Sequence, residues 1–194
     1  MLAFRDRSQP SSLPECRAES LAMGPVKNSR LPEEALLRQY SQDGHYTDCF
    51  SIEISQSVTH SQYVAAFYTT FLFKIERFIL RWAVSKPSTD AEAVQLAEKQ
   101  RSSFAAWEVE ARNDDQLLLC DFQGRTRCWL MVEPMPQEQV HWTRLYFGSA
   151  VVRNRESKGV PKSNKFGFSA LLSFHRLYSL ALLYSAKRRL ESAK

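Results

Sequence analysis

The sequence predicts an α+β protein in which an antiparallel sheet of about five to seven strands packs on a long C-terminal helix. Three observations support this prediction. Apolar and polar residues alternate over residues 46–54 and again from residue 104 to 152, as in strands that bury one face. Between these two stretches apolar residues recur every three or four positions, which predicts two inserted helices. The same spacing returns after the second stretch and predicts the final helix.

The chain has 194 residues, of which 44% are hydrophobic, and this suits one domain with a core of its own. Residues 1–29 hold three prolines and many serines and charges without an apolar period, so we expect a disordered N-terminal tail. Met23 is an alternative start to Met1. Residues 30–190 then form a single α+β domain, and residues 191–194 form a short C-terminal tail.

The first elements are a short helix and a strand. Residues 31–40 begin with Pro32 and two glutamates and continue with apolar residues on one side, which predicts a short helix. Asp43-Gly44 turns the chain into a first strand at about 46–54.

The two inserted helices follow this strand. The first is expected from about residue 60 to 84, with an aromatic face formed by Tyr63, Phe67, Phe71, Ile75, Phe78 and Trp82. Lys74, Glu76, Arg77 and Arg81 interrupt this stretch, and each charge would cost several kcal/mol at the centre of a bilayer, so we exclude a membrane span. Lys86-Pro87 ends the helix, and residues 88–90 offer N-caps for a second, amphipathic helix over residues 91–100.

A four-stranded meander and the C-terminal helix complete the domain. A strand near 104–111 precedes a hairpin of residues 116–122 and 125–133 about Gln123-Gly124, a loop over residues 134–139, and a strand over residues 140–152. This turn pairs Leu118 with Trp129 and Cys120 with Arg127, so Cys120 and Cys128 point to opposite faces and cannot form a disulfide. The last helix reaches Lys187, Arg188 and Arg189, whose charges suit its C-terminal end.

This order of elements resembles the helix-grip fold of START lipid-transfer, pollen-allergen and polyketide-cyclase-like proteins, although we count about five strands where that sheet commonly has seven. The phrases YTDCF, FYTTFLFKIERFIL, DFQGRTRCWLMVEP and TRLYFGSAVV are also similar to a family of uncharacterised bacterial proteins over roughly residues 31–190. The second resemblance implies no particular chemistry. The helix-grip topology implies a ligand site between the sheet and the C-terminal helix.

Arg125 and Arg127 flank the hairpin turn, and three interpretations of them remain open. They lie in water, or they join a structural network with Glu133, Glu110 or Asp121, or Arg127 and Arg144 bind the carboxylate or phosphate of an apolar ligand. Our leading hypothesis takes the third interpretation, with a lipid or other apolar small molecule as ligand. Its predicted binding residues are Arg127, Arg144, Trp129, Tyr146, Trp142, Phe67, Phe71 and Tyr178.

A catalytic function is the first alternative. The segment Gly167-Phe168-Ser169-Ala170-Leu171 lacks the second glycine of a nucleophile elbow, so Ser169 is predicted to be an ordinary helix residue. His175 is the one catalytic candidate, as the acid or base of a cyclase or hydrolase together with Tyr178 or Tyr146. A structural histidine is the favoured interpretation, and we therefore favour binding over catalysis.

Composition limits the remaining partners and cofactors. The four cysteines form no CxxC pair and the four histidines show no metal-binding spacing, so no metal or cofactor is expected, and a cytoplasmic protein with free thiols is the default. Residues 153–165 and 187–194 carry a net charge of +7, which leaves about −2 for the rest of a chain whose formal charge is +5. This distribution argues against nucleic-acid binding and suits contact with an anionic membrane surface. The second alternative is a non-catalytic protein that dimerises through the aromatic helix.

Overall fold

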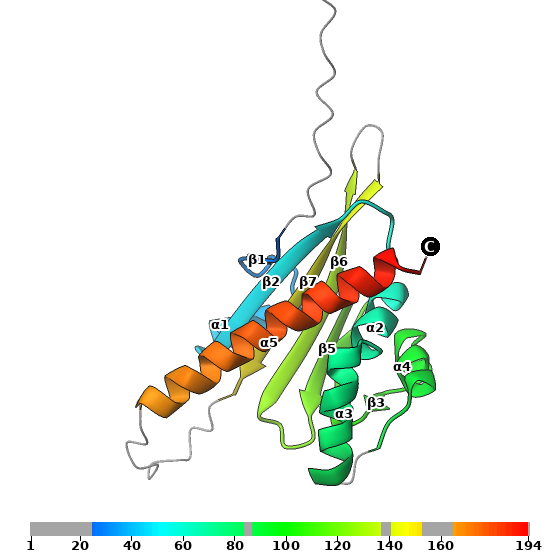
Figure 1. Ribbon diagram of the computed structural model, residues 1–194. Helices are drawn as coiled ribbons and strands as arrows, with labels where there is room; N and C mark the ends of the chain where they lie inside the picture. Colours follow the sequence, from blue (N-terminus) through cyan, green and yellow to red (C-terminus); the bar gives the residue numbers. More distant parts are fainter. Residues whose placement is uncertain (1–24, 84–86, 137–140, 153–164, 194) are drawn as a thin grey trace, which may run out of the picture.

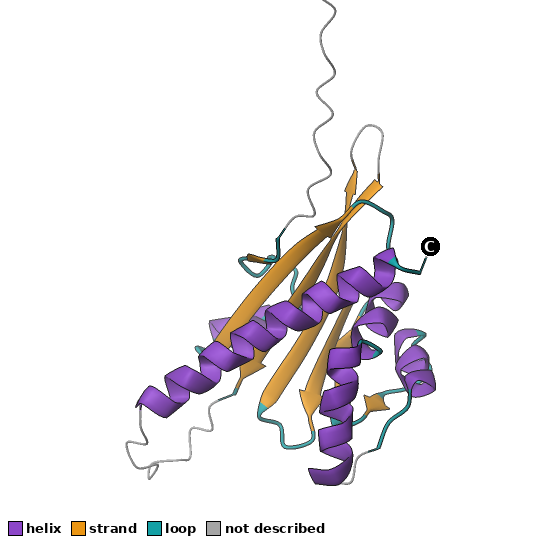
Figure 2. Ribbon diagram, viewed as in Figure 1, coloured by secondary structure: helices purple, strands orange, loops and turns teal. Residues whose placement is uncertain are grey.

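A computed structural model describes residues 25–83, 87–136, 141–152 and 165–193, with residues 79–83, 136 and 165–174 described by their backbone alone. The protein is an α+β fold built on one antiparallel sheet of seven strands in the order β1-β2-β7-β6-β5-β4-β3 (Figure 1). The helix α5 runs diagonally across one face of the sheet, and α2 and α3 lie beside it (Figure 2). The predicted fold class is therefore confirmed.

The strands are β1 (Lys27–Asn28), β2 (Tyr46–Ile54), β3 (Ser103–Phe104), β4 (Trp107–Arg112), β5 (Gln116–Asp121), β6 (Thr126–Pro136) and β7 (His141–Val151). The helices are α1 (Arg38–Gln42), α2 (His60–Tyr68), α3 (Phe71–Ala83), α4 (Asp90–Ala97) and α5 (Lys165–Glu191). Ser169 lies within α5, as predicted. The basic loop at 153–164 and residues 1–24 of the predicted tail lie outside the described residues.

The first predicted strand matches β2 at both ends. Lys27 and Asn28, which the sequence places in the N-terminal tail, instead pair with β2, where Lys27 lies opposite Ser51. A hydrogen bond of 2.6 Å between the hydroxyls of Ser29 and Ser51 holds this short strand at the edge of the sheet.

The single aromatic helix predicted for residues 60–84 is two helices, so three helices rather than two follow β2. The break falls at two threonines whose hydroxyls satisfy backbone groups at the helix ends. Thr69 donates to the Ala65 carbonyl at 2.6 Å, and Thr70 accepts from the Phe73 amide at 3.2 Å. Such bonds compete with continued helix formation, whereas the apolar spacing runs on through the break. The next predicted helix is confirmed as α4, and Thr89 caps its N-terminus.

The predicted pairing of the hairpin is confirmed, with Leu118 opposite Trp129 and Cys120 opposite Arg127. The loop predicted to begin at Pro134 is wrong, because β6 continues to Pro136 and residues 134–136 pair with β7. The pairing of β6 with β5 ends at Met131, which lies opposite Gln116. Beyond Met131 the described strand that pairs with β6 is β7. A proline, which lacks an amide hydrogen, is tolerated in such a stretch.

Both faces of the sheet are covered. One face, which includes Leu130 and Phe147, packs against α2 and α5 in the larger core. The other face carries a smaller core in which Trp129 and Tyr146 pack against Leu37, just before α1. At the centre of this smaller core Gly148 has no room for a side chain, since an added Cβ would lie 2.9 Å from both the Trp129 ring and Leu37.

Candidate functional site

A pocket with a volume of about 540 Å³ lies between α3, α5 and the sheet, and this volume is within the range of small-molecule sites. Its walls come from α2, α3, α5 and the strands β4, β6 and β7. The lining residues are Phe67, Leu72, Phe73, Ile75, Glu76, Trp107, Thr126, Arg127, Cys128, Phe147, Ser149, Ala150, Val151, His175, Tyr178 and Leu182. Most of these side chains are apolar, so the pocket suits an apolar ligand with few polar groups.

The inner wall of the pocket is aromatic. Phe67 of α2 packs on Phe147 of β7 and on Phe73 of α3, with ring centroids 5.0 and 6.2 Å apart. All three side chains are buried, and their tilted contacts are of the kind that stabilises aromatic clusters. Phe67 and Phe73 thus meet in this wall from either side of the break between α2 and α3.

Glu76 and Tyr178 join α3 to α5 at the pocket. The Tyr178 hydroxyl donates to Glu76 Oε2 at 2.6 Å. Burial raises the pKa of the Glu76 carboxyl, and the hydrogen bond from Tyr178 opposes this rise. Burial likewise raises the pKa of Tyr178, with a further contribution from Glu76, so Tyr178 remains protonated and acts as the donor.

Cys128 is the one cysteine in the lining of this pocket. Its sulfur lies 3.2 Å from the Tyr68 hydroxyl, and burial raises the pKa of the thiol to about 12. A buried thiol of this kind stays protonated at neutral pH and is a poor nucleophile. Cys49 and Cys120 are free thiols as well, and Cys16 lies outside the described residues.

His175 lies at the β2–β7 side of the pocket in a polar cluster with Ser149 and Asp48. The Ser149 hydroxyl is 2.7 Å from His175 Nε2 and donates to Asp48 Oδ1 at 2.7 Å, while the Ser149 amide donates to the same oxygen at 3.0 Å. The single hydroxyl proton therefore goes to Asp48, and His175 Nε2 is the donor toward Ser149. A nucleophilic serine needs the opposite polarity, with imidazole as acceptor and the carboxylate at its other nitrogen. The cluster therefore holds α5 on β2 and β7 rather than forming a catalytic triad.

Arg127 contributes to the pocket wall and is bound in an ion pair. Its Nε lies 2.5 Å from Glu110 and donates to the Tyr40 hydroxyl at 2.8 Å, while its guanidinium lies 4.8 Å from the Tyr40 ring centroid. Tyr40 in turn donates to Glu110. The guanidinium therefore ties α1 to the sheet, and Glu110 is one of the partners that the structural-network interpretation named.

Arg144 lies in a second, separate ion-pair cluster. It lies 3.0 Å from Glu53 and 3.2 Å from Glu133, and the Tyr146 hydroxyl donates to Glu133 at 2.7 Å. Arg144 pairs with Glu133 across the sheet, whereas Arg127 lies six residues earlier on the same strand as Glu133, about 20 Å away at 3.3 Å per residue. The structure does not bring the two arginines together.

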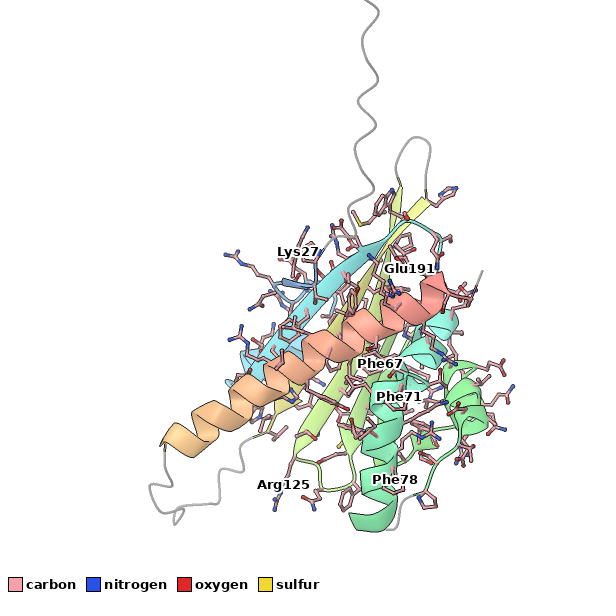
Figure 3. All side chains as sticks on the ribbon, viewed as in Figure 1. Lys27, Phe67, Phe71, Phe78, Arg125 and Glu191 are labelled. Atoms are coloured by element: carbon pink, nitrogen blue, oxygen red, sulfur yellow. The ribbon has the colours of Figure 1, made fainter. Side chains whose placement is uncertain are left out.

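The remaining predicted ligand-binding residues divide between the two faces of the sheet. Phe67 and Tyr178 line the pocket. Trp129 and Tyr146 are buried in the smaller core, where the Trp129 indole donates to Gln116 at 2.9 Å. The other two lie outside the lining. Trp142 is half-buried at the start of β7, opposite Met135 of β6. Phe71 is 79% exposed on α3 (Figure 3).

Sequence reasoning did not select Glu76, Ser149 or Asp48 as site residues. For Glu76 a signal was present, because the residues three and four positions before and after this carboxylate, which share its side of a helix, are all apolar. Ser149 and Asp48 meet only through the pairing of β2 with β7, in which they lie directly opposite each other. Spacing along the chain does not indicate such a contact.

Comparison with models of known protein families and with curated proteins found no match for this chain. In the described part of the chain no three His, Cys, Asp or Glu side chains group as metal ligands. None of the described helices is long and apolar enough to cross a bilayer. The fold and the pocket define an α+β protein with a mainly apolar pocket beside its C-terminal helix.

Proposed function

We propose that this protein binds an apolar small molecule, such as a lipid, in the pocket between α3, α5 and the sheet. The observation that carries the proposal is the pocket itself, about 540 Å³ in volume and walled mainly by aromatic and aliphatic side chains. Sites for small molecules in proteins are typically apolar hollows of this size with a few polar groups that orient the ligand.

The topology supports placing the protein with the helix-grip proteins. Its first long strand, β2, pairs with the last strand, β7, and the strands then follow in reverse order to β3. A long C-terminal helix crosses the face that holds the pocket (Figure 1). The same face would hold the ligand in the predicted arrangement.

The polar groups of the pocket do not favour the anionic head group expected from the sequence. Arg127 and Arg144 are both paired with glutamates, and the guanidinium of Arg127 is directed to Tyr40. The polar side chains left to a ligand include Glu76 with Tyr178 and His175 with Ser149. The ligand that we propose is therefore an apolar molecule whose polar end does not require an arginine.

A binding titration with a pocket-filling variant tests this function. N-phenyl-1-naphthylamine, a neutral dye whose fluorescence rises in apolar sites, would bind the wild-type protein saturably at about one molecule per chain. Val151→Trp fills the pocket and would weaken this binding by about tenfold or more, as expected when a ligand loses its apolar contacts. Val152→Trp is the matched control, since Val152 is outside the lining and equally half-buried. Equal binding by both variants would overturn the proposal.

Catalysis in the same pocket is a second candidate, favoured by the observation that His175 and Tyr178 both line it. A chromogenic ester such as p-nitrophenyl hexanoate tests the hydrolase form of this alternative. Multiple turnovers that disappear in His175→Gln would support an enzyme. Saturable binding of the dye without turnover would support the binding function alone.

A further inference from the structure

The carboxyl group of Glu76 lies in a mainly apolar pocket with few groups to stabilise its negative charge. Among the described residues its hydrogen-bond donor is Tyr178, which contacts Oε2, and no lysine or arginine pairs with it. A carboxylate can accept about four hydrogen bonds, and a buried one is costly without a cation or several donors.

The cations nearest to Glu76 along the chain are engaged elsewhere. Lys74 and Arg77, on the same helix, both pair with Asp90, at 2.5 and 2.6 Å. Arg77 also donates to Ser88 through its side-chain and backbone oxygens. Asp90 therefore has two cationic partners at the surface, whereas no lysine or arginine in the described part of the chain pairs with Glu76.

The other groups around the pocket do not supply this cation. Arg127 is paired with Glu110, and His175 faces Ser149 and Asp48. Glu76 lines the pocket, and Asp48 lies beside it at His175, so this region holds two carboxylates, of which His175 contacts Asp48. A positively charged group on a ligand would be attracted to such a pocket, and a carboxylate would be repelled.

Building on the proposed binding function, we propose that the pocket selects apolar ligands that carry a protonated amine, which pairs with the carboxylate of Glu76. The Tyr178 hydroxyl holds Oε2 and fixes the orientation of the carboxylate. Among the described residues nothing donates to Oε1, which is the oxygen that would meet the ligand. The aromatic wall of Phe67, Phe73 and Phe147 then receives the apolar part of the ligand.

Three probes of equal chain length test the selectivity: decylamine, 1-decanol and decanoic acid, each titrated by calorimetry at neutral pH below its aggregation threshold. The wild-type protein would bind decylamine about tenfold or more tightly than 1-decanol, as a charge-assisted hydrogen bond allows, and decanoic acid most weakly. Glu76→Gln keeps the shape and an acceptor for Tyr178, and would bind amine and alcohol with equal affinity. Glu33→Gln makes the same charge change at an exposed position and would keep the wild-type preference.

The outcomes separate this inference from the proposed function. If none of the three probes binds, the binding function itself fails. If they bind with equal affinities, or if Glu76→Gln keeps the amine preference, the selectivity is wrong and the binding function stands. Thermal melting establishes that the variants are folded. If Glu76→Gln does not fold, Glu76→Asp replaces it, because this variant shortens the side chain by one methylene and moves the carboxylate away from the ligand. The preference for the amine must then fall while the affinity for the alcohol is retained.

Discussion

The Tyr178 hydroxyl donates a hydrogen bond of 2.6 Å to Glu76 Oε2 and so ties α5 to α3 at the pocket. The bond has an energetic consequence that depends on pH. Burial raises the folded-state pKa of Glu76 above its unfolded value, so this group favours the folded state most below the unfolded pKa. That contribution is lost as pH rises through the folded pKa, where the ionised carboxylate depends most on its donor.

Tyr178→Phe therefore destabilises the protein more at pH 8 than at pH 5. We expect a loss of about 2 kcal/mol in the free energy of unfolding at pH 8, the usual value of a hydrogen bond to a charged group. Urea titrations at both pH values measure the loss. In a Glu76→Gln background Tyr178→Phe would lower the free energy of unfolding equally at pH 5 and pH 8. An equal loss at the two pH values in the wild-type background would contradict the role of Glu76.

His60 gives a second pH dependence. Its side chain is buried at the start of α2, and in the described part of the chain its Nε2 has no hydrogen-bond partner. Burial lowers the pKa of His60 to about 4, helped by the positive charges of Lys99 and Arg112, while the backbone of Leu130 acts in the opposite direction. The unfolded chain binds this proton more tightly, so stability is lost as pH falls from about 6.5 to 4.

The loss from His60 amounts to about 3 kcal/mol at pH 4, because each tenfold difference in proton affinity is worth about 1.4 kcal/mol. His60→Phe removes the titrating group. Chemical unfolding of both proteins across this range would show a smaller acid destabilisation in the variant. Parallel curves would mean that His60 takes up its proton in the folded state at its ordinary pKa.

Arg144→Ala separates the sequence-based hypothesis from the structure. The sequence predicts that Arg144 binds the head group of the ligand. In the structure Arg144 pairs with Glu53 and Glu133 and is absent from the pocket lining. We expect the dye affinity of Arg144→Ala to stay within about twofold of wild type, as for changes with no shared contacts. A tenfold loss in a folded variant would restore Arg144 as a ligand-binding residue.

Phe67 and Phe71, one turn apart in the sequence, provide a matched pair for packing. Phe67 is fully buried, whereas Phe71 is 79% exposed. Phe67→Ala is expected to lower the free energy of unfolding by about 3–5 kcal/mol, and Phe71→Ala by about 0.5 kcal/mol or less. Urea titrations give both values. A large loss for Phe71→Ala that depends on protein concentration would instead support dimerisation through α3, which sedimentation would detect.

The elements that were predictable from the sequence depend on local patterns. The strand at 46–54 and the hairpin pairing of Leu118 with Trp129 follow from period-two alternation and a glycine turn, both of which act over a few residues. The break between α2 and α3 was missed because the apolar spacing continues across Thr69 and Thr70, where hydroxyl bonds end one helix and begin the next.

The site was harder to predict because both faces of the sheet are apolar. Alternation correctly separated Leu130 from Trp129, but it does not say which face α5 covers. Arg127 and Trp129 were assigned to the ligand, whereas α5 covers the opposite face, that of Cys128 and Leu130. The position of α5 depends on contacts between residues more than a hundred positions apart, such as Tyr178 with Glu76.

Native mass spectrometry of the freshly purified protein tests the central claim most directly, when it is compared with the denatured mass and with an organic extract of the same sample. We predict an adduct of a few hundred daltons on the native protein, its loss on denaturation, and its absence from Val151→Trp. Two results together would contradict a ligand-binding pocket. The native mass would equal the denatured mass, and the extract of the wild-type protein would contain the same compounds as the extract of Val151→Trp.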